Sequence, residues 1–256
     1  MNPSPLSSIR PATTDDFDRI AAIAAEGDSS DSNARYLSFV AEHGRLLVAV
    51  LDEGVDAFGG MVPVPMGEPG GDTSVAMVTD LFVTVGHRGR GLGEALLDEL
   101  LDGHPRRMTA SSKHPAAVPA YRRAGMQPRW NLLYLEGVAT GGGPPLQPAA
   151  WQHDRAELIA HFAADGAMVT ADAVAMVDDE GVDVLRVHSD DAIRVMTEVS
   201  MAFAAGVRIR ACVPERHPLA TWMQARGFAV VDHDVFCTSE GVEFSSAVSC
   251  VHAGLA

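Results

Sequence analysis

Lysine is almost absent from this chain of 256 residues, in which Lys113 is the only one. The chain has 19 Lys and Arg residues against 34 Asp and Glu residues, which gives a formal net charge of −15. Binding to a nucleic-acid backbone needs clustered basic side chains, so we expect no nucleic-acid partner. An acidic surface serves solubility, and it would also favour a cationic small molecule as ligand.

Cysteine is scarce as well, and metal-binding motifs are missing. The three cysteines, Cys212, Cys237 and Cys250, show no Cys-x-x-Cys spacing, so we expect a reduced, cytoplasmic protein without structural zinc. The 10 histidines include no His-Glu-x-x-His motif, which argues against a metal site. No apolar run approaches the ~18 residues of a membrane-spanning helix, and the first residues do not resemble a secretory signal. We therefore expect no membrane association.

A segment rich in glycine and proline, residues 139–150, divides the chain. It holds three glycines and three prolines and no charged residue, so neither helix nor strand should form there. We expect two domains, residues 1–138 and 151–256, joined by this linker.

Strand and helix signals alternate along the first half. Strands are expected over residues 8–10, 45–51, 57–64, 74–83, 107–111 and 130–135, and helices over 15–25, 33–42 and 94–102. A short fourth helix should end at Arg123, and Pro119 should delay its start to about Val118. Antiparallel strands followed by alternating helices and strands predict an α/β protein with a mixed, mostly antiparallel sheet flanked by helices.

The second half repeats the later part of this pattern about 102 residues further on. His114-Pro-Ala-Ala recurs as His217-Pro-Leu-Ala, and Arg-Ala-Gly-Met126 recurs as Ala-Arg-Gly-Phe228. In the second copy, strands are expected before and after these motifs, over residues 207–213 and 229–236. A duplicated unit explains the repetition, so we predict two copies in tandem.

A glycine-rich loop is the most informative segment. It reads Arg88-Gly-Arg-Gly-Leu-Gly93 and lies between the expected strand 74–83 and the expected helix 94–102. Glycines let a backbone approach a ligand closely, and a helix N-terminus offers N–H groups and partial positive charge. With two arginines, the loop suits a pyrophosphate. The Walker pattern needs Gly-Lys-Ser/Thr where this chain has Gly93-Glu-Ala, and the dinucleotide-binding pattern needs a different glycine spacing. A purely structural glycine turn is the alternative.

The loop resembles the acyl-CoA loop of the GCN5-related N-acetyltransferase (GNAT) family, Q/R-x-x-G-x-G/A. Downstream, the family pattern N-x-x-A-x-x-x-Y-x-x-x-G-F resembles His114-x-x-Ala-x-x-x-Tyr121-x-x-x-Gly125-Met126, with histidine for asparagine and methionine for phenylalanine. By element order the resemblance covers roughly residues 8–136. It implies a GNAT-like fold and acetyl-CoA as cosubstrate.

The resemblance also implies the site residues. Backbone groups of Leu81, Phe82 and Val83 would bind the pantetheine arm and the thioester carbonyl, and their N–H groups would stabilise charge on the thioester oxygen. Tyr121 would protonate the leaving thiolate. The pyrophosphate would be held by the backbone amides of Arg88, Gly89, Arg90, Gly91, Leu92, Gly93 and Glu94.

Acetyl transfer to an amine also needs a proton acceptor, because an alkylammonium has a pKa near 10.4. Asp80 is our candidate base, since it directly precedes the segment expected to contact the thioester. A structural role for Asp80 is the alternative, and a water chain could then take the proton. No Cys or Ser stands beside a base in the motif region, so we expect direct attack by the amine in a ternary complex.

The second half lacks the glycine loop. Its strand at 182–187 is followed by Asp190 and Asp191, which would repel a pyrophosphate, and Met223 stands in the place of Tyr121. We expect a degenerate copy without cosubstrate, which buttresses the fold and walls part of the acceptor cleft.

Several questions stay open at this point. The expected function is an N-acetyltransferase acting on a primary, possibly cationic, small-molecule amine. The alternatives are a non-catalytic CoA-binding sensor, an interaction module, or an acyltransferase that uses another acyl-CoA or a protein amine. A monomer and a homodimer are both compatible with the sequence.

Overall fold

A computed structural model describes residues 8–27, 33–51, 54–65, 74–153, 155–243 and 248–251. Within these ranges the chain divides into two compact units. The described residues of the first unit lie within the bounds Met1–Thr109, Pro115–Gln127 and Thr238–Val242, and those of the second lie within Ala110–His114, Pro128–Cys237 and Glu243–Ala256. No helix in the described ranges is long and apolar enough to cross a membrane.

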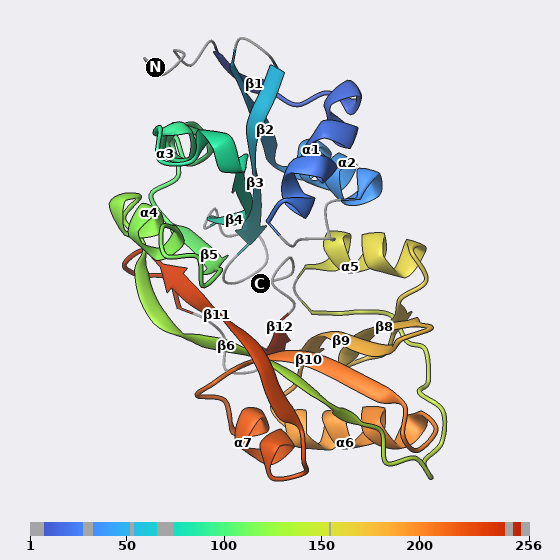
Figure 1. Ribbon diagram of the computed structural model, residues 1–256. Coiled ribbons are helices and arrows are strands. Elements are labelled where there is room, and N and C mark those ends of the chain that lie inside the picture. Colours follow the sequence, from blue (N-terminus) through green and yellow to red (C-terminus); the bar gives the residue numbers. More distant parts are fainter. Residues whose placement is uncertain are drawn as a thin grey trace. The chain divides into compact units, whose positions relative to one another are not determined.

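The sheet of the first unit has the strand order β1-β2-β3-β4-β5. Its strands are β1 (Ser8–Pro11), β2 (Arg45–Leu51), β3 (Gly54–Pro65), β4 (Ser74–Val83) and β5 (Arg107–Ser111), and its helices are α1 (Phe17–Ala25), α2 (Ala34–His43), α3 (Leu92–Leu100) and α4 (Ala117–Arg123) (Figure 1). Neighbouring strands from β1 to β4 are antiparallel, whereas β5 is parallel to β4. The predicted mixed, mostly antiparallel sheet flanked by helices is confirmed.

Two neighbouring glycines of β3 show which helix covers which face of this sheet. A side-chain carbon on Gly59 would lie 2.6 Å from Leu100 of α3, whereas one on Gly60 would lie 3.2 Å from Val40 of α2. Successive residues of a strand point to opposite faces, so α2 and α3 lie on opposite faces. Leu100 and Val40 are both fully buried, which places hydrophobic packing on each side of the sheet.

The second unit is also a sheet with helices. Its strand order is β11-β6-β10-β9-β8-β7, and β12 pairs with β9. The strands are β6 (Gln127–Val138), β7 (Met168–Val169), β8 (Ala173–Asp178), β9 (Gly181–His188), β10 (Arg208–Pro214), β11 (Ala229–Thr238) and β12 (Val248–Val251), and the helices are α5 (Ala156–Ala164), α6 (Ala192–Ala202) and α7 (Pro218–Gln224). Strands β9, β10 and β11 were predicted, whereas α5, β7, β8 and β12 were not.

Strand β6, predicted to complete the first domain, groups with the second unit instead. It pairs antiparallel with β10, from Val138 opposite Arg208 to Leu132 opposite Pro214. Conversely, the segment Thr238–Val242 groups with the first unit. The structure therefore does not divide at the predicted linker. The reason is that an alternating pattern predicts a strand but does not specify its partner.

Residues 139–150 contain no helix or strand, as predicted, but they are not a free tether. The Ala139 N–H donates to the Val207 carbonyl at 2.7 Å, and the Gly143 N–H donates to the Met201 carbonyl at 2.9 Å. Gly141 has φ +70°, and a side-chain carbon there would lie 2.9 Å from a backbone nitrogen. Backbone hydrogen bonds thus make this segment an ordered part of the second unit.

Helices α4 and α7 end in the same way, which supports the predicted duplication. After α4, the Met126 N–H donates to the Tyr121 carbonyl at 2.9 Å across Gly125 (φ +82°). After α7, the Phe228 N–H donates to the Met223 carbonyl at 3.2 Å across Gly227 (φ +88°). Both ends are Schellman motifs, in which glycine adopts the left-handed conformation. The two motifs place Met223 at the position that Tyr121 has in the first copy.

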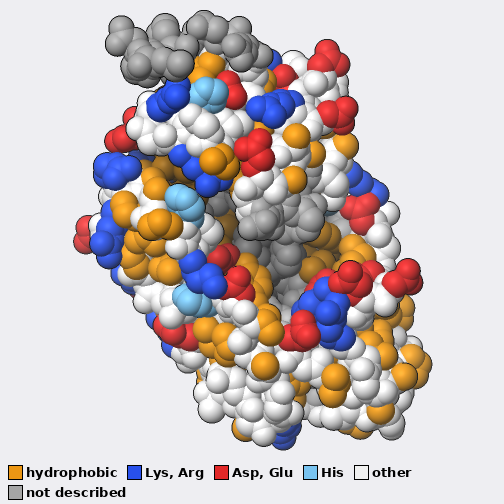
Figure 2. Space-filling view, viewed as in Figure 1, with side chains coloured by type: hydrophobic (Ala, Val, Ile, Leu, Met, Phe, Trp, Pro, Cys, Tyr) orange, Lys and Arg blue, Asp and Glu red, His pale blue; other side chains and the backbone are white. Residues whose placement is uncertain are grey.

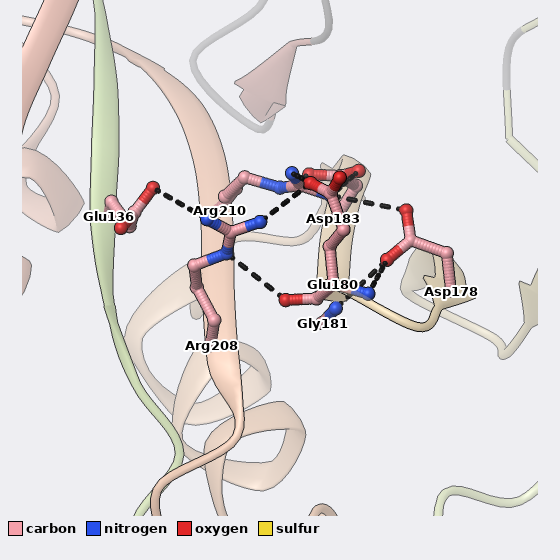
Figure 3. A network of polar contacts seen from close by, with 7 residues as sticks. All are labelled: Glu136, Asp178, Glu180, Gly181, Asp183, Arg208 and Arg210. Carbon is pink, nitrogen blue, oxygen red and sulfur yellow. Dashed lines mark hydrogen bonds and ion pairs between the residues drawn. The ribbon is translucent and has the colours of Figure 1, made fainter.

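Ion pairs connect four strands of the second unit, β6, β8, β9 and β10, and the pair to β6 joins Arg208 and Glu136 (Figure 3). Arg210 donates to Asp183 at 2.6 Å and lies 3.3 Å from Asp178, while Arg208 contacts Glu180 at 2.7 Å. The backbone N–H groups of Glu180 and Gly181 donate to Asp178, and the first of these bonds is the main reason why the pKa of Asp178 is lowered. On the face shown in Figure 2, Lys and Arg side chains lie beside Asp and Glu side chains at several places.

We expect replacement of Asp234 by asparagine to stabilise the second unit at neutral pH. Burial raises the pKa of the Asp234 carboxyl, although Tyr134 Oη donates to it at 2.7 Å. A carboxyl with a raised pKa is more easily ionised in the unfolded chain, so stability falls as the pH rises from the unfolded pKa through the folded one. Asp234→Asn removes this loss. In thermal unfolding at pH 7 we expect a melting temperature about 2–4 °C higher, with the difference disappearing in acid.

Asp232→Asn is the matched control for this substitution. Lys113 forms an ion pair with Asp232 and lowers the pKa of its carboxyl, so neutralising Asp232 should not stabilise the protein at pH 7. A lower melting temperature for Asp234→Asn than for the unmodified chain at pH 7 would contradict this interpretation.

Candidate functional site

The edge of β4 that faces β5 is paired over only part of its length. The parallel register begins at Ala76 opposite Arg107 and ends at Val78 opposite Thr109. Thr109 Oγ1 donates to the Val78 carbonyl at 2.9 Å at this last pair. Residues 79–83 of β4 continue beyond the register, so their backbone groups on this edge are not part of the ladder with β5.

The backbone alternation decides which of the predicted residues face that edge. The Thr84 N–H donates to the Asp56 carbonyl of β3 at 2.9 Å. The backbone groups of successive residues in a strand point to opposite edges, so Val83 and Leu81 face away from β3. Phe82 was predicted to contribute backbone contacts as well, but it lies two residues before Thr84 and opposite Phe58, so its backbone N–H and C=O point toward β3. The part of the β4 edge that continues past the pairing with β5 is therefore formed by Leu81 and Val83.

The glycine loop begins after a short 3₁₀ helix, Val85–His87, at the end of β4. Gly89 and Gly91 have φ values of +75° and +85°, and a side-chain carbon at either would meet no atom within 4 Å. Positive φ values of this size favour glycine. The open space beside both residues fits the prediction that a ligand approaches the backbone here.

Helix α3 begins at Leu92, two residues before the predicted start at Glu94. Its first hydrogen bond runs from the Ala95 N–H to the Gly91 carbonyl at 3.0 Å. Helix geometry leaves the preceding N–H groups, those of Leu92, Gly93 and Glu94, without a partner in the helix. They add to the positive end of the helix dipole, so the loop meets the chemical requirement for holding an anionic group.

Charged side chains surround this loop. Arg88 and Arg90 are exposed, and Arg88 Nε donates to the Val83 carbonyl at 3.1 Å. The carboxylate of Glu94 lies 3.4 Å from Nε of Arg123, which offsets the one negative charge in the first turn of α3. The residues present therefore fit the pyrophosphate that the resemblance implies.

Asp80 lies on β4 immediately before the exposed edge and is 8% exposed. The ladder between β3 and β4 is irregular here, since Gly60 lies opposite Asp80 and Met61 lies opposite Val78. Thr79 is the extra residue of this β-bulge, and bulges often redirect side chains beside active sites. A side-chain carbon on Gly60 would lie 3.0 Å from Asp80 Oδ2 and 3.2 Å from Val40 of α2. The Asp80 carboxylate therefore lies on the α2 face of the sheet.

Tyr121 lies on α4 and is 6% exposed. The helix begins at Ala117, one residue earlier than predicted, and includes Pro119 in its first turn. Proline is tolerated there because an N–H group in the first turn has no helical acceptor. Pro119 therefore does not displace Tyr121 from a regular helix.

The corresponding edge in the second unit is covered by β12. The parallel register of β10 and β9 ends at Ala211 opposite Val184. Beyond that pair, β12 runs antiparallel to β9, with Val248 opposite His188 and Val251 opposite Arg186. Since β8 pairs with the other edge of β9, β12 occupies the edge that corresponds to the one formed by Leu81 and Val83 in the first unit. The backbone groups of β9 on this edge are therefore paired with β12.

We therefore expect the full chain to bind one molecule of acetyl-CoA. The first unit has an exposed strand edge and a glycine loop, whereas the second has β12 on that edge and Asp191 at the start of α6. Native mass spectrometry at saturating ligand should give a stoichiometry of one, and the Arg88→Glu/Arg90→Glu variant should show a much smaller bound fraction at the same ligand concentration. Two ligands per chain would contradict the assignment of the second edge.

One polar residue close to Asp80 was not predicted. Tyr36 of α2 donates from Oη to Asp80 Oδ2 at 2.9 Å. The sequence feature that could have indicated Tyr36 is that it is the one tyrosine in this expected helix, whose other inward positions are aliphatic or phenylalanine.

In the described part of the chain, no group of three His, Cys, Asp or Glu side chains could hold a metal ion.

Comparisons with known proteins agree with this geometry. Residues 8–129 match the family described as acetyltransferase (GNAT) domain. No match was found among curated proteins. The fold is similar to that of a candidate acetyltransferase from Pyrococcus horikoshii, with 15% identity and a TM-score of 0.77. The alignment covers 97% of this chain and 95% of the Pyrococcus chain.

Two further solved structures share the fold at lower similarity. A candidate acetyltransferase from Thermoplasma acidophilum has 16% identity and a TM-score of 0.56 over 90% of this chain and 98% of its own. A GCN5-related N-acetyltransferase from Kribbella flavida has 15% identity and a TM-score of 0.56 over 90% and 71%. At these identities the likeness concerns the fold alone. Residues 8–129 of this chain, a little under half of it, are therefore a GNAT acetyltransferase domain.

Proposed function

We propose that the first unit transfers an acetyl group from acetyl-CoA to a primary amine by direct attack in a ternary complex. The observation that carries this proposal is the continuity of β4. One strand carries the buried carboxylate of Asp80, then the edge formed by Leu81 and Val83, and then leads into the glycine loop. Proton acceptor, strand edge and anion-binding loop thus follow one another along a single segment.

The cosubstrate would be held by backbone groups. When bound, acetyl-CoA supplies the acetyl group as a thioester. Leu81 and Val83 would bind the pantetheine arm, and the amides of residues 88–94, with the Arg88 and Arg90 side chains, would hold the pyrophosphate. Backbone N–H groups that point at a carbonyl oxygen stabilise the charge that develops there during attack. This explains why the edge needs no particular side chain.

The acceptor amine must lose a proton before or during attack. At pH 7 only about one alkylammonium in 2,500 is neutral, which corresponds to about 4.6 kcal/mol. Asp80 would take the proton that frees the lone pair of the nitrogen. The nitrogen then bonds to the acetyl carbon, the carbon–sulfur bond breaks, and the second nitrogen proton passes to water. Tyr121 would then donate a proton to the thiolate. The carboxylate of Asp80 also favours an acceptor that carries positive charge before it reacts.

A thiol-release assay with acetyl-CoA and a panel of primary amines tests this function. We expect CoA release that depends on both substrates, with propionyl-CoA and an N-terminal peptide amine included to define the acyl group and the class of acceptor. Binding of CoA without turnover on any amine would reject the enzyme and favour the non-catalytic sensor.

A further inference from the structure

The carboxylate of Asp80 accepts two hydrogen bonds on the same oxygen. Tyr36 Oη donates to Asp80 Oδ2 at 2.9 Å, and Thr79 Oγ1 donates to the same atom at 2.8 Å. Asp80 is 8% exposed, while Tyr36 is half-buried. Both donors are neutral hydroxyl groups, so they bind the carboxylate without cancelling its charge.

The fold brings Tyr36 to Asp80 from a separate element, 44 residues earlier in the chain. Asn33 caps α2 by accepting from the Tyr36 N–H at 3.0 Å, which fixes the first turn of the helix. Leu37 and Val40 in the following turn are fully buried. The cap and the buried face together set the position of the Tyr36 side chain relative to the sheet.

The β-bulge supplies the other half of the arrangement. A side-chain carbon on Gly60 would lie 2.6 Å from Thr79 Oγ1 and 3.0 Å from Asp80 Oδ2. Both polar side chains therefore converge over Gly60, where only a residue without a side chain leaves them room. Thr79 and Tyr36 can then reach the same carboxylate oxygen.

From this geometry we infer that Tyr36 is a positioning residue, whose hydroxyl holds the Asp80 carboxylate in one orientation and keeps it ionised for removal of the amine proton. The inference rests on the proposed function of Asp80. Burial disfavours a charged carboxylate, whereas hydrogen bonds donated to the charged form favour it. The Tyr36 hydroxyl thus compensates for the burial that the strand imposes on Asp80.

Tyr36→Phe is the direct test, because it removes the hydroxyl and keeps the ring. Loss of one hydrogen bond to a charged group should move the acid limb of the pH profile of kcat to higher pH by about one unit. At a pH on that limb kcat should fall about tenfold, while the dissociation constant of acetyl-CoA stays unchanged. A purely structural role for Tyr36 would not shift the profile.

Tyr134→Phe is the matched control. Tyr134 Oη also donates to a carboxylate, that of Asp234, at 2.7 Å, but in the second unit. The same substitution there should leave the pH profile of kcat where it is. An unshifted profile in Tyr36→Phe, or an equal shift in both variants, would overturn the inference.

A titration followed by carboxyl ¹³C NMR separates this inference from the proposed function. In Tyr36→Phe the Asp80 carboxyl should titrate at higher pH than in the unmodified chain, whether or not the protein turns over an amine. An unchanged Asp80 titration rejects the positioning role, whereas failure of every amine in the assay rejects the proposed function. If Tyr36→Phe does not fold, Thr79→Val removes the other donor and should shift the same titration in the same direction.

Discussion

Asp80→Asn is expected to lower kcat for amine acetylation about 10²- to 10⁴-fold, the range typical for loss of a positioned general base. Asparagine has nearly the same shape and can still accept a hydrogen bond from Tyr36 Oη, but it cannot take a proton from the amine. Binding of acetyl-CoA should be unaffected, because Asp80 points to the α2 face while Leu81 and Val83 form the edge. Steady-state kinetics together with calorimetry of acetyl-CoA would measure both quantities.

Asp98→Asn provides the control for this change. Asp98 is exposed on α3, so the substitution makes the same change of charge in the same unit away from β4, and kcat should stay unchanged. Full activity of Asp80→Asn at neutral pH would show that another group, such as a water chain, accepts the proton.

Reversing both arginines of the glycine loop is expected to weaken acetyl-CoA binding at least about 100-fold. Each hydrogen bond to a charged group contributes about 1.5–3 kcal/mol, and every 1.4 kcal/mol is tenfold in affinity. In Arg88→Glu/Arg90→Glu both proposed contacts to the pyrophosphate would be lost and two negative charges are added. Calorimetric titration of the variant with acetyl-CoA measures this loss directly.

The corresponding control reverses two exposed arginines in the second unit. Arg129→Glu/Arg226→Glu changes the net charge by the same amount, and both side chains are exposed. Affinity for acetyl-CoA should change little, because neither arginine belongs to the glycine loop and salt screens the field of exposed charges. Equal losses in both double variants would mean that the arginines act through net charge and not through a local site.

The elements of the first unit were predictable where local patterns determine them. The strands expected over 45–51, 74–83 and 107–111 have the same bounds as β2, β4 and β5. The first two lie between turn-forming residues, and all three carry runs of apolar and β-branched residues that favour strands. The glycine loop was predictable for a similar reason, because its conformation depends on residues within it.

Features that depend on pairing were not predictable in this way. The pattern of β6 indicates a strand, but only the register with β10 shows that it joins the second unit. The same holds for β12, a short strand whose position on β9 follows from tertiary contacts. Periodicity describes one segment at a time, whereas partner choice depends on packing of the whole unit.

Within the candidate site, the same distinction separates Asp80 from Tyr36. Asp80 was predicted because it precedes the loop on the same strand. Tyr36 lies 44 residues earlier and reaches Asp80 only because a capped helix packs on the face to which the bulge directs the carboxylate. The exclusion of Phe82 from the exposed edge likewise required the register of β4 with β3.

Residue-level hydrogen exchange, followed by NMR with and without CoA, tests the central claim most directly. We expect CoA to slow exchange of the backbone amides of residues 88–94 and of Leu81 and Val83, while the exchange rates of the amides of β9 and β12 do not change. Unchanged exchange throughout the glycine loop, or slowing confined to the second unit, would contradict the claim that this loop holds the diphosphate of the cosubstrate.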